Sequence, residues 1–183
     1  GVSSWRSITV NDIYTNCLNY NVTLNSHMMK NDEWGAVAYL SKSKYGKNVE
    51  VTINDNTSYY TGGGSGNAYV SNVGQSTTGT VYGVYDMSGG SFEYVAAYVN
   101  NGNISLTSYG SSLINGNSKT KNVYSKASSD SNENNYNANF SKYGDAVYET
   151  SMSGSGSTSW YDDYSGFPNT SYPFFIRGGY WRY

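Results

Sequence analysis

Few side chains in this sequence have the types and the spacing that catalysis requires. The chain has one histidine, His27, and one cysteine, Cys17. A nucleophilic serine or a histidine-bound metal would depend on His27 alone, and no serine lies in the glycine-flanked turn that exposes a nucleophile. Asp162 and Asp163 are adjacent, so in a strand they point to opposite faces and cannot flank one glycosidic bond. The sequence therefore predicts that the protein is not an enzyme.

The chemistry that the sequence does offer is that of a binding surface. Residues 160–183 are dense in aromatic side chains, interspersed with short polar ones. Exposed tyrosine and tryptophan give rigid contact area for sugars or peptides, but the same rings also build protein cores. We expect phenylalanine and tryptophan mainly inside and the polar and tyrosine positions mainly outside. The residues expected at the surface are Tyr161, Asp162, Asp163, Tyr164 and Tyr183.

Composition narrows the classes of protein to which this chain can belong. It has 183 residues, enough for one domain with a core, and only 13% of them are charged, for a net charge of −2. Such a balance gives no electrostatic footprint for nucleic acid, and no apolar run is long enough to span a membrane. A low-charge surface rich in Asn, Ser, Thr and Tyr is typical of extracellular or cell-surface proteins, although codon bias could produce the same excess.

Two helices are predicted early in the chain, followed by strands and loops. Residues 8–20 have apolar positions at helical spacing, with Thr9 or Asn11 as a cap and Cys17 on the apolar side as a buried thiol. Residues 31–44 form a second helix that Asn31 would cap. Residues 49–53 alternate as a short strand, and residues 99–159 are polar, low in complexity and expected to be largely irregular.

Two motifs resemble a known family. Residues 82–94 read Y-G-V-Y-D-M-S-G-G-S-F-E-Y, and residues 175–181 read F-I-R-G-G-Y-W. They are similar to the paired signatures of the formylglycine-generating-enzyme (sulfatase-modifying-factor) superfamily, and residues 30–39 resemble its second helix. The resemblance implies an α+β, C-type lectin-like fold with two helices, a small twisted antiparallel sheet and long ordered loops. It also implies one domain over residues 1–183 that lacks its final C-terminal strands.

The resemblance points to the non-catalytic side of that superfamily. Its oxidases hold copper with two cysteines after the R-G-G-S motif, and its sulfoxide synthases hold iron with a histidine cluster. Neither set is present here. Shorter runs at residues 26–31, 36–41 and 171–175 look like a subgroup in surface proteins of gut Firmicutes, often behind a pilin-type N-terminus. Related lectin-fold domains are targets of diversity-generating retroelements or form phage tail tips.

A structural calcium ion is a further implication of the resemblance. In the oxidases the ion lies within the first motif, at positions that correspond here to Asp86, Gly89, Ser91 and Glu93. Carboxylate and carbonyl oxygens in a tight turn suit a hard cation. The alternative is that both carboxylates accept hydrogen bonds around a folded loop without a metal. Gly90 stands where the family has asparagine, which would loosen the turn.

These observations predict a ligand-binding domain outside the cell, on a pilus, a surface fibre or a phage tail. Its partner would be a protein or a glycan on another surface. The alternatives are a structural subunit that associates with its own copies in a filament, and a divergent oxidase. Arg177 is expected to be structural, because the family has this motif at the core of its sheet. Variable positions of the family cluster around the R-G-G-x-W strand, so the ligand contacts are placed beside Arg177. These contacts are Tyr161, Asp162, Asp163, Tyr164, Tyr180, Arg182 and Tyr183.

Overall fold

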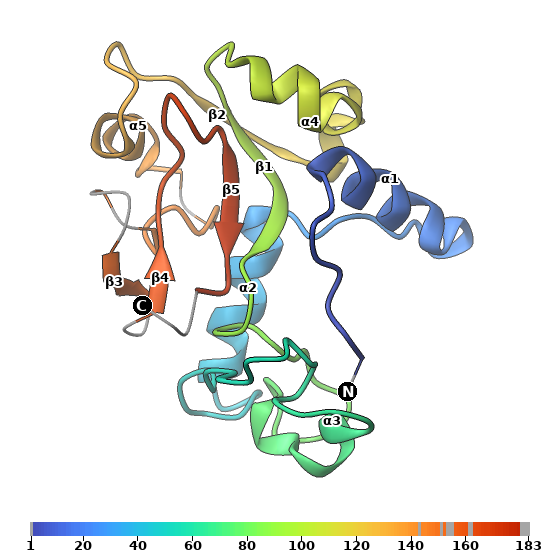
Figure 1. The fold of residues 1–183 in the computed structure, drawn as a ribbon. Coiled ribbons are helices and arrows are strands. Elements are labelled where there is room, and N and C mark those ends of the chain that lie inside the picture. The colour runs from blue at the N-terminus through green and yellow to red at the C-terminus, as the bar shows by residue number, and fades with distance from the viewer. Residues whose placement is uncertain (1, 143, 151, 153–155, 161–162, 180–183) are drawn as a thin grey trace.

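The computed structural model describes residues 2–142, 144–150, 152, 156–160 and 163–179, and gives only the backbone of residues 156–160 and 163. Its helices are α1 (Val10–Tyr20), α2 (Asn31–Lys42), α3 (Ala68–Ser71), α4 (Ile104–Asn115) and α5 (Asn132–Asn139), with 3-10 turns η1 (Val22–Leu24), η2 (Val73–Gln75) and η3 (Ser118–Thr120). Its strands are β1 (Glu93–Asn100), β2 (Asn122–Ser125), β3 (Gly156–Trp160), β4 (Asp163–Ser165) and β5 (Phe174–Arg177). The fold is therefore α+β, as expected (Figure 1).

The central sheet has β1 in the middle, with β2 and β5 on its two sides. β1 pairs antiparallel with β5, with Glu93 opposite Arg177, and parallel with β2, with Tyr98 opposite Val123. The prediction of an antiparallel sheet is therefore wrong for one pairing. The chain between β1 and β2 crosses back as α4, so β2 enters the sheet in the same direction as β1. A separate antiparallel hairpin joins β3 and β4.

The two predicted helices are present, but one predicted cap is wrong. The hydroxyl of Thr9 accepts a hydrogen bond from the Asp12 N–H at 3.2 Å and caps α1, as expected. In α2 the cap is Lys30, whose N–H donates to the Glu33 carboxylate at 2.9 Å. Asn31 is instead the first helical residue, and its side chain is fully buried. A side chain drawn into the core by tertiary contacts cannot fold back over its own helix terminus.

The segment from residue 99 to residue 159 is more regular than predicted. It contains α4, β2 and α5, and β3 begins near its end. The helix α4 buries Leu106 and Leu113, two turns apart on one face, and Asn103 caps it. Residues 49–53 form no strand; only an isolated bridge joins Asn54 to Gly89. Among the described residues, no helix has the length and apolar character needed to cross a membrane.

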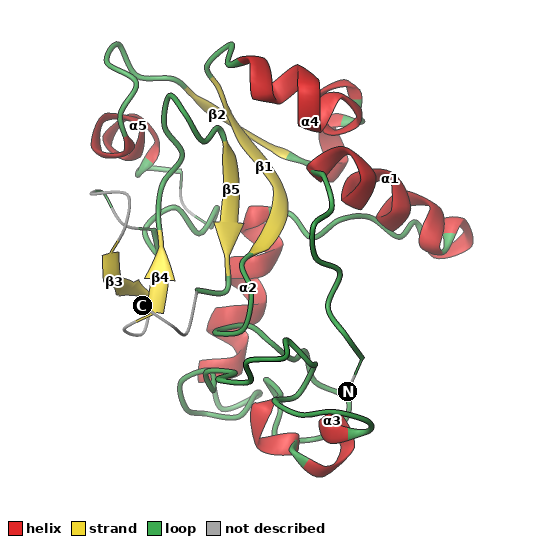
Figure 2. Cartoon of the chain, viewed as in Figure 1, coloured by secondary structure: helices red, strands yellow, loops and turns green. Residues whose placement is uncertain are grey.

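Two hydrophobic clusters lie on opposite faces of β1. Val95, Ala97 and Val99 point to one face, where Trp34 and Ala38 of α2 cover them. Ala96 and Tyr98 point to the other face, together with buried side chains of α1 and α4. Figure 2 shows α1 and α4 side by side at one end of β1. The alternation of a strand thus gives each sheet face its own helical cover, but α1 and α4 cover only part of theirs.

Candidate ligand-binding groove

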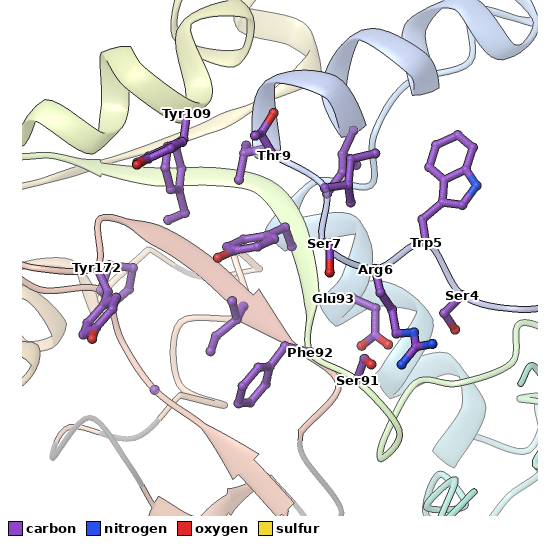
Figure 3. Close-up of a pocket in the computed structure, with 18 of the residues that line it drawn as sticks. Ser4, Trp5, Arg6, Ser7, Thr9, Ser91, Phe92, Glu93, Tyr109 and Tyr172 are labelled. Carbon is purple, nitrogen blue, oxygen red and sulfur yellow. The ribbon is translucent and has the colours of Figure 1, made fainter. Parts of the chain in front are cut away.

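An open groove lies on the part of the β1–β5 face that α1 and α4 leave uncovered (Figure 3). Its volume is about 1990 Å³. The floor comes from residues 91–94 and from β5, one wall is the N-terminal segment 3–10, and the other is the loop 166–173. Figure 3 shows these two segments on either side of the floor, with Tyr109 of α4 at the same end as Tyr172.

The floor of the groove is aromatic because of the alternation in β1. Tyr94 points to the same face as Tyr98, but Tyr98 lies under the helices and Tyr94 does not. The ring of Tyr94 packs edge-on against Phe174, with centroids 6.3 Å apart. The ring of Phe92 lies 5.0 Å from that of Tyr164. Burial raises the pKa of the Tyr94 hydroxyl above its ordinary value of 10, so it remains a hydrogen-bond donor.

The N-terminal wall is held by a few contacts with the loop around residue 60. Ser3 forms an antiparallel bridge with Tyr60, and the Ser4 N–H donates to the Tyr59 carbonyl at 3.1 Å. The guanidinium of Arg6 lies over the Tyr59 ring, 4.7 Å from its centroid. Figure 3 shows Arg6 and Ser4 at the same end of the groove as Ser91 and Glu93. This wall therefore gives the groove a polar end.

The opposite wall is fixed by amide side chains in addition to the buried ring of Phe167. Asn135 donates to the Asp130 carboxylate at 2.6 Å and to the Pro168 carbonyl at 3.0 Å. Asn169 donates to the side-chain oxygen of Asn132 at 2.9 Å. These bonds link α5 to the loop that presents Tyr172. Because its backbone carbonyls are satisfied by side chains, the loop is held in one conformation before any ligand arrives.

The two sequence motifs meet beside the groove. The Gly89 N–H donates to the Gly178 carbonyl at 2.5 Å. A Cβ on Gly178, which has a φ of +84°, would lie 1.7 Å from a carboxylate oxygen of Glu93. A Cβ on Gly89 would lie 2.4 Å from the backbone oxygen of Asn54. The glycines of both motifs therefore allow close approach of neighbouring chain, which explains their presence without reference to a ligand.

Comparison with known proteins assigns this chain to no family. No family model, curated protein or solved structure matched this chain. The resemblance to the formylglycine-generating-enzyme superfamily therefore rests on the motifs alone, and what it implies is taken up below as a proposal.

The residues predicted to bind calcium lie near one another in sequence, but Asp86 is used as a hydrogen-bond acceptor. Its Oδ1 accepts from Asn54 Nδ2 at 2.8 Å and from the Gly62 N–H at 3.2 Å. Burial raises its pKa above the ordinary 3.8, although these donors lower it. Glu93 lies across from Arg177 on the neighbouring strand.

This donor set is a poor fit to calcium. An oxygen that faces N–H donors is not directed at a cation, and Ca²⁺ takes six to eight oxygen ligands. The described residues contain no group of three or more His, Cys, Asp or Glu side chains that could hold a metal ion, so calcium bound here would depend on carbonyl and hydroxyl oxygens. The calcium prediction for Asp86, Gly89, Ser91 and Glu93 stays a prediction. A rise in melting temperature with added Ca²⁺ would support it.

One of the predicted ligand contacts can be placed in the groove. Tyr164 lines it, next to Phe92. Asp163 begins β4, and only its backbone is described. The other predicted contacts lie outside the described residues: Tyr161, Asp162, Tyr180, Arg182 and Tyr183.

Most of the groove was missed by sequence reasoning. Tyr94, Tyr109, Tyr172 and the segment before α1 line it, yet they lie far apart in the sequence. The one available signal was the alternation in residues 94–98, which puts Tyr94 and Tyr98 on the same face of a strand. That signal does not say which of the two a helix will cover.

Of the three residues that we expect to be structural, Phe167 and Arg177 are buried, and the side chain of Trp160 lies outside the described part of the structure. Phe167 and Arg177 are each 1% exposed. The Arg177 guanidinium donates to Asn31 Oδ1 at 2.7 Å and lies 4.5 Å from the ring centroid of Trp34. Burial lowers its pKa to about 10, while the charge of Glu149 raises it, so Arg177 stays charged at neutral pH. Cys17 is partly buried on α1, and burial raises the pKa of its thiol.

Proposed function

We propose that this chain is a non-catalytic ligand-binding domain that acts outside the cell, on a pilus, a surface fibre or a phage tail. In this proposal its α+β fold is of the C-type lectin-like type. The ligand is a protein or a glycan on another cell or surface. The observation that supports the proposal best is the large aromatic groove, which is built on a rigid sheet face and stays open beside a well-packed core.

The composition of the groove fits binding better than chemistry. Its charged side chains among the described residues are Arg6, Asp86 and Glu93, and the rest are aromatic, hydroxyl, amide or aliphatic groups. Catalysis needs a positioned acid, base or nucleophile with a matched partner. Aromatic anchors with short polar neighbours instead resemble a binding surface. Copper-dependent oxidation of a thiol substrate by the purified domain would contradict the proposal and favour the oxidase alternative.

The test is a binding array printed with oligosaccharides and extracellular proteins. The double variant Tyr109→Ala/Tyr172→Ala removes two rings from one end of the groove. The matched control, Tyr45→Ala/Tyr82→Ala, removes two tyrosines that are 76% and 91% exposed and do not line it. We expect the wild type and the control to bind the same spots and the groove variant to lose them. Binding that survives in the groove variant, or no binding by the wild type, would count against the proposal.

A filament subunit is the second candidate, and one surface favours it. Tyr20, Val22 and Leu24, at the end of α1 and in η1, are all strongly exposed. Adjacent exposed apolar side chains of this size often mark a surface that another protein covers. Sedimentation velocity on the wild type and on Val22→Asp would test it. Concentration-dependent association that Val22→Asp abolishes supports a filament subunit, and a wild type that stays monomeric excludes one built through this surface.

A further inference from the structure

We infer that the groove takes a linear, uncharged oligosaccharide, which stacks on its aromatic rings without the help of a metal ion. This inference rests on the proposed binding function and names the class of ligand. Four properties of the groove carry it: its size, its ring faces, its hydroxyl groups and its charge.

The size of the groove favours an extended ligand over a small molecule. Sites for single drug-sized ligands have volumes of roughly 300–1,000 Å³. The groove has a volume of about 1990 Å³ and is open to solvent. A single sugar ring would leave most of the walls uncovered, so several linked rings are needed to contact both of them.

The exposed rings give flat apolar surfaces along the groove. Tyr94, Tyr109 and Tyr172 are 40%, 55% and 75% exposed, and all three line it. One face of a sugar ring presents C–H groups, which pack against an aromatic face and remove apolar area from water on both sides. The three rings come from three different elements, β1, α4 and the loop 166–173, so a ligand that contacts all of them must extend across the groove.

The polar groups of the groove match sugar hydroxyls. Ser4, Ser7 and Ser91 line its polar end (Figure 3). A hydroxyl donates one hydrogen bond and accepts others, so serine and tyrosine can pair with a sugar hydroxyl in either direction. The floor strand β5 is at the edge of the three-stranded sheet in the described part of the chain. A peptide that adds a strand there is therefore the competing ligand, and the protein spots of the array test it.

The charges of the groove disfavour anionic ligands. Two carboxylates, Asp86 and Glu93, are present against one cation, Arg6, among the described lining residues. Arg6 is already engaged with the ring of Tyr59. The described lining therefore offers an anionic chain a single cation, so it favours a neutral chain over a uronate or sulfated one. Since Asp86 accepts hydrogen bonds from Asn54 and Gly62, binding through a bridging cation is not expected either.

The experiment uses the array described above with linear oligosaccharides of increasing length, both neutral and uronate, and repeats each measurement with a metal chelator. We expect neutral chains of several sugars to bind, single sugars to bind at least about tenfold more weakly, and the chelator to change nothing. The Tyr109→Ala/Tyr172→Ala variant should lose about tenfold or more in affinity, because a few aromatic anchors carry most of the binding energy of an interface. The Tyr45→Ala/Tyr82→Ala control should bind like the wild type. Circular dichroism and the melting temperature verify that both variants fold.

The other outcomes separate this inference from the proposed function. If only protein spots bind, and the groove variant loses them, the ligand class is wrong and the binding function stands. Binding to uronates alone, or binding that the chelator abolishes, also overturns the inference without affecting that function. If no spot depends on the groove, both fail.

Discussion

The two faces of β1 arise from the same alternating sequence pattern but differ in how completely they are buried. On one face Val95, Ala97 and Val99 are all buried under α2 and the aromatic core. On the other face Ala96 and Tyr98 are buried under α1 and α4, whereas Tyr94 remains exposed. The strand is the same, so the difference comes from the helices. A helix that stops short of the end of a strand leaves side chains that can contact a ligand.

The comparison also separates the residues that hold the fold from those that can vary. On the closed face, which α2 covers, the buried Arg177 guanidinium contacts Asn31 and Trp34. The open half, which the helices leave uncovered, is lined by the exposed residues Tyr94, Tyr109 and Tyr172. Substitutions on the closed face should therefore change stability, and substitutions in the open half should change binding with little effect on stability.

The largest expected effect is on the closed face, from Arg177→Met. Removing the guanidinium leaves the buried Glu149 and Asn31 without their charged partner, which we expect to cost about 3–5 kcal/mol in the free energy of unfolding. Urea denaturation measures this loss. The control is Arg6→Met, the same change on the exposed groove wall, which should stay within about 0.5 kcal/mol of the wild type. Equal losses in the two variants would remove the distinction between the faces.

A smaller effect is expected from Gly110→Ala, in the helix α4, which covers part of the face that carries the groove. A Cβ at this position would lie 2.5 Å from the Phe174 ring, so the ring must shift. We expect a loss of about 1–2 kcal/mol from overpacking. Since Phe174 also packs against Tyr94, ligand binding should weaken as well.

The matched control for that change is Gly74→Ala. A Cβ at residue 74 meets no atom within 4 Å, so the melting temperature should hardly change. If Gly110→Ala proves as stable as Gly74→Ala, then the covered half of the face is more loosely packed than the structure indicates.

The smallest expected effect is a pH dependence far from the groove. His27 donates to the Asn25 carbonyl and pairs with Glu33 at 3.0 Å, which raises its pKa above 6.5. Burial raises the pKa of Glu33, but bonds from the Lys30 N–H and from His27 outweigh it and bring the pKa below 4.5. The stabilisation from the His27 charge is fully present below pH 6.5 and is lost as the pH rises through the pKa of His27 in the folded protein. The stabilisation from the Glu33 carboxylate is fully present above pH 4.5 and is lost as the pH falls through the pKa of Glu33 in the folded protein.

The pair should therefore contribute most between pH 4.5 and 6.5. Glu33→Gln keeps an acceptor for the Lys30 N–H but loses the charge. Because both side chains are about one third exposed, we expect it to lower the free energy of unfolding by only about 0.5 kcal/mol in that window, and by less at higher pH. Thermal melts over a pH series measure the difference. A loss that is independent of pH would show that the His27–Glu33 charge pair contributes nothing, because the Glu33 carboxylate also lies 3.5 Å from the Lys30 ammonium at every pH in the series.

Part of the fold was predictable because the controlling interactions are local. The spacing of apolar residues placed α1 and α2, and Thr9 caps α1 as its position predicted. Phe167 and Arg177 were expected inside and are buried. By contrast, α4 and α5 lie in a segment rich in Asn and Ser whose composition predicted irregular structure. In α5 the buried amides of Asn135 and Asn139 bond distant backbone groups, so the stability of that helix comes from tertiary contacts.

The sequence by itself determined the α+β class, the low charge, the scarcity of catalytic groups and the abundance of tyrosine. Only the tertiary structure decided which tyrosines line a groove. Residues 3–10, 91–94 and 166–176 come together there from three distant parts of the chain. Whether Tyr94 or Tyr98 lies open depends on where α1 and α4 end over the sheet, and no local pattern contains that information. The physical reason is that periodicity specifies the face to which a side chain points, whereas burial depends on what packs against that face.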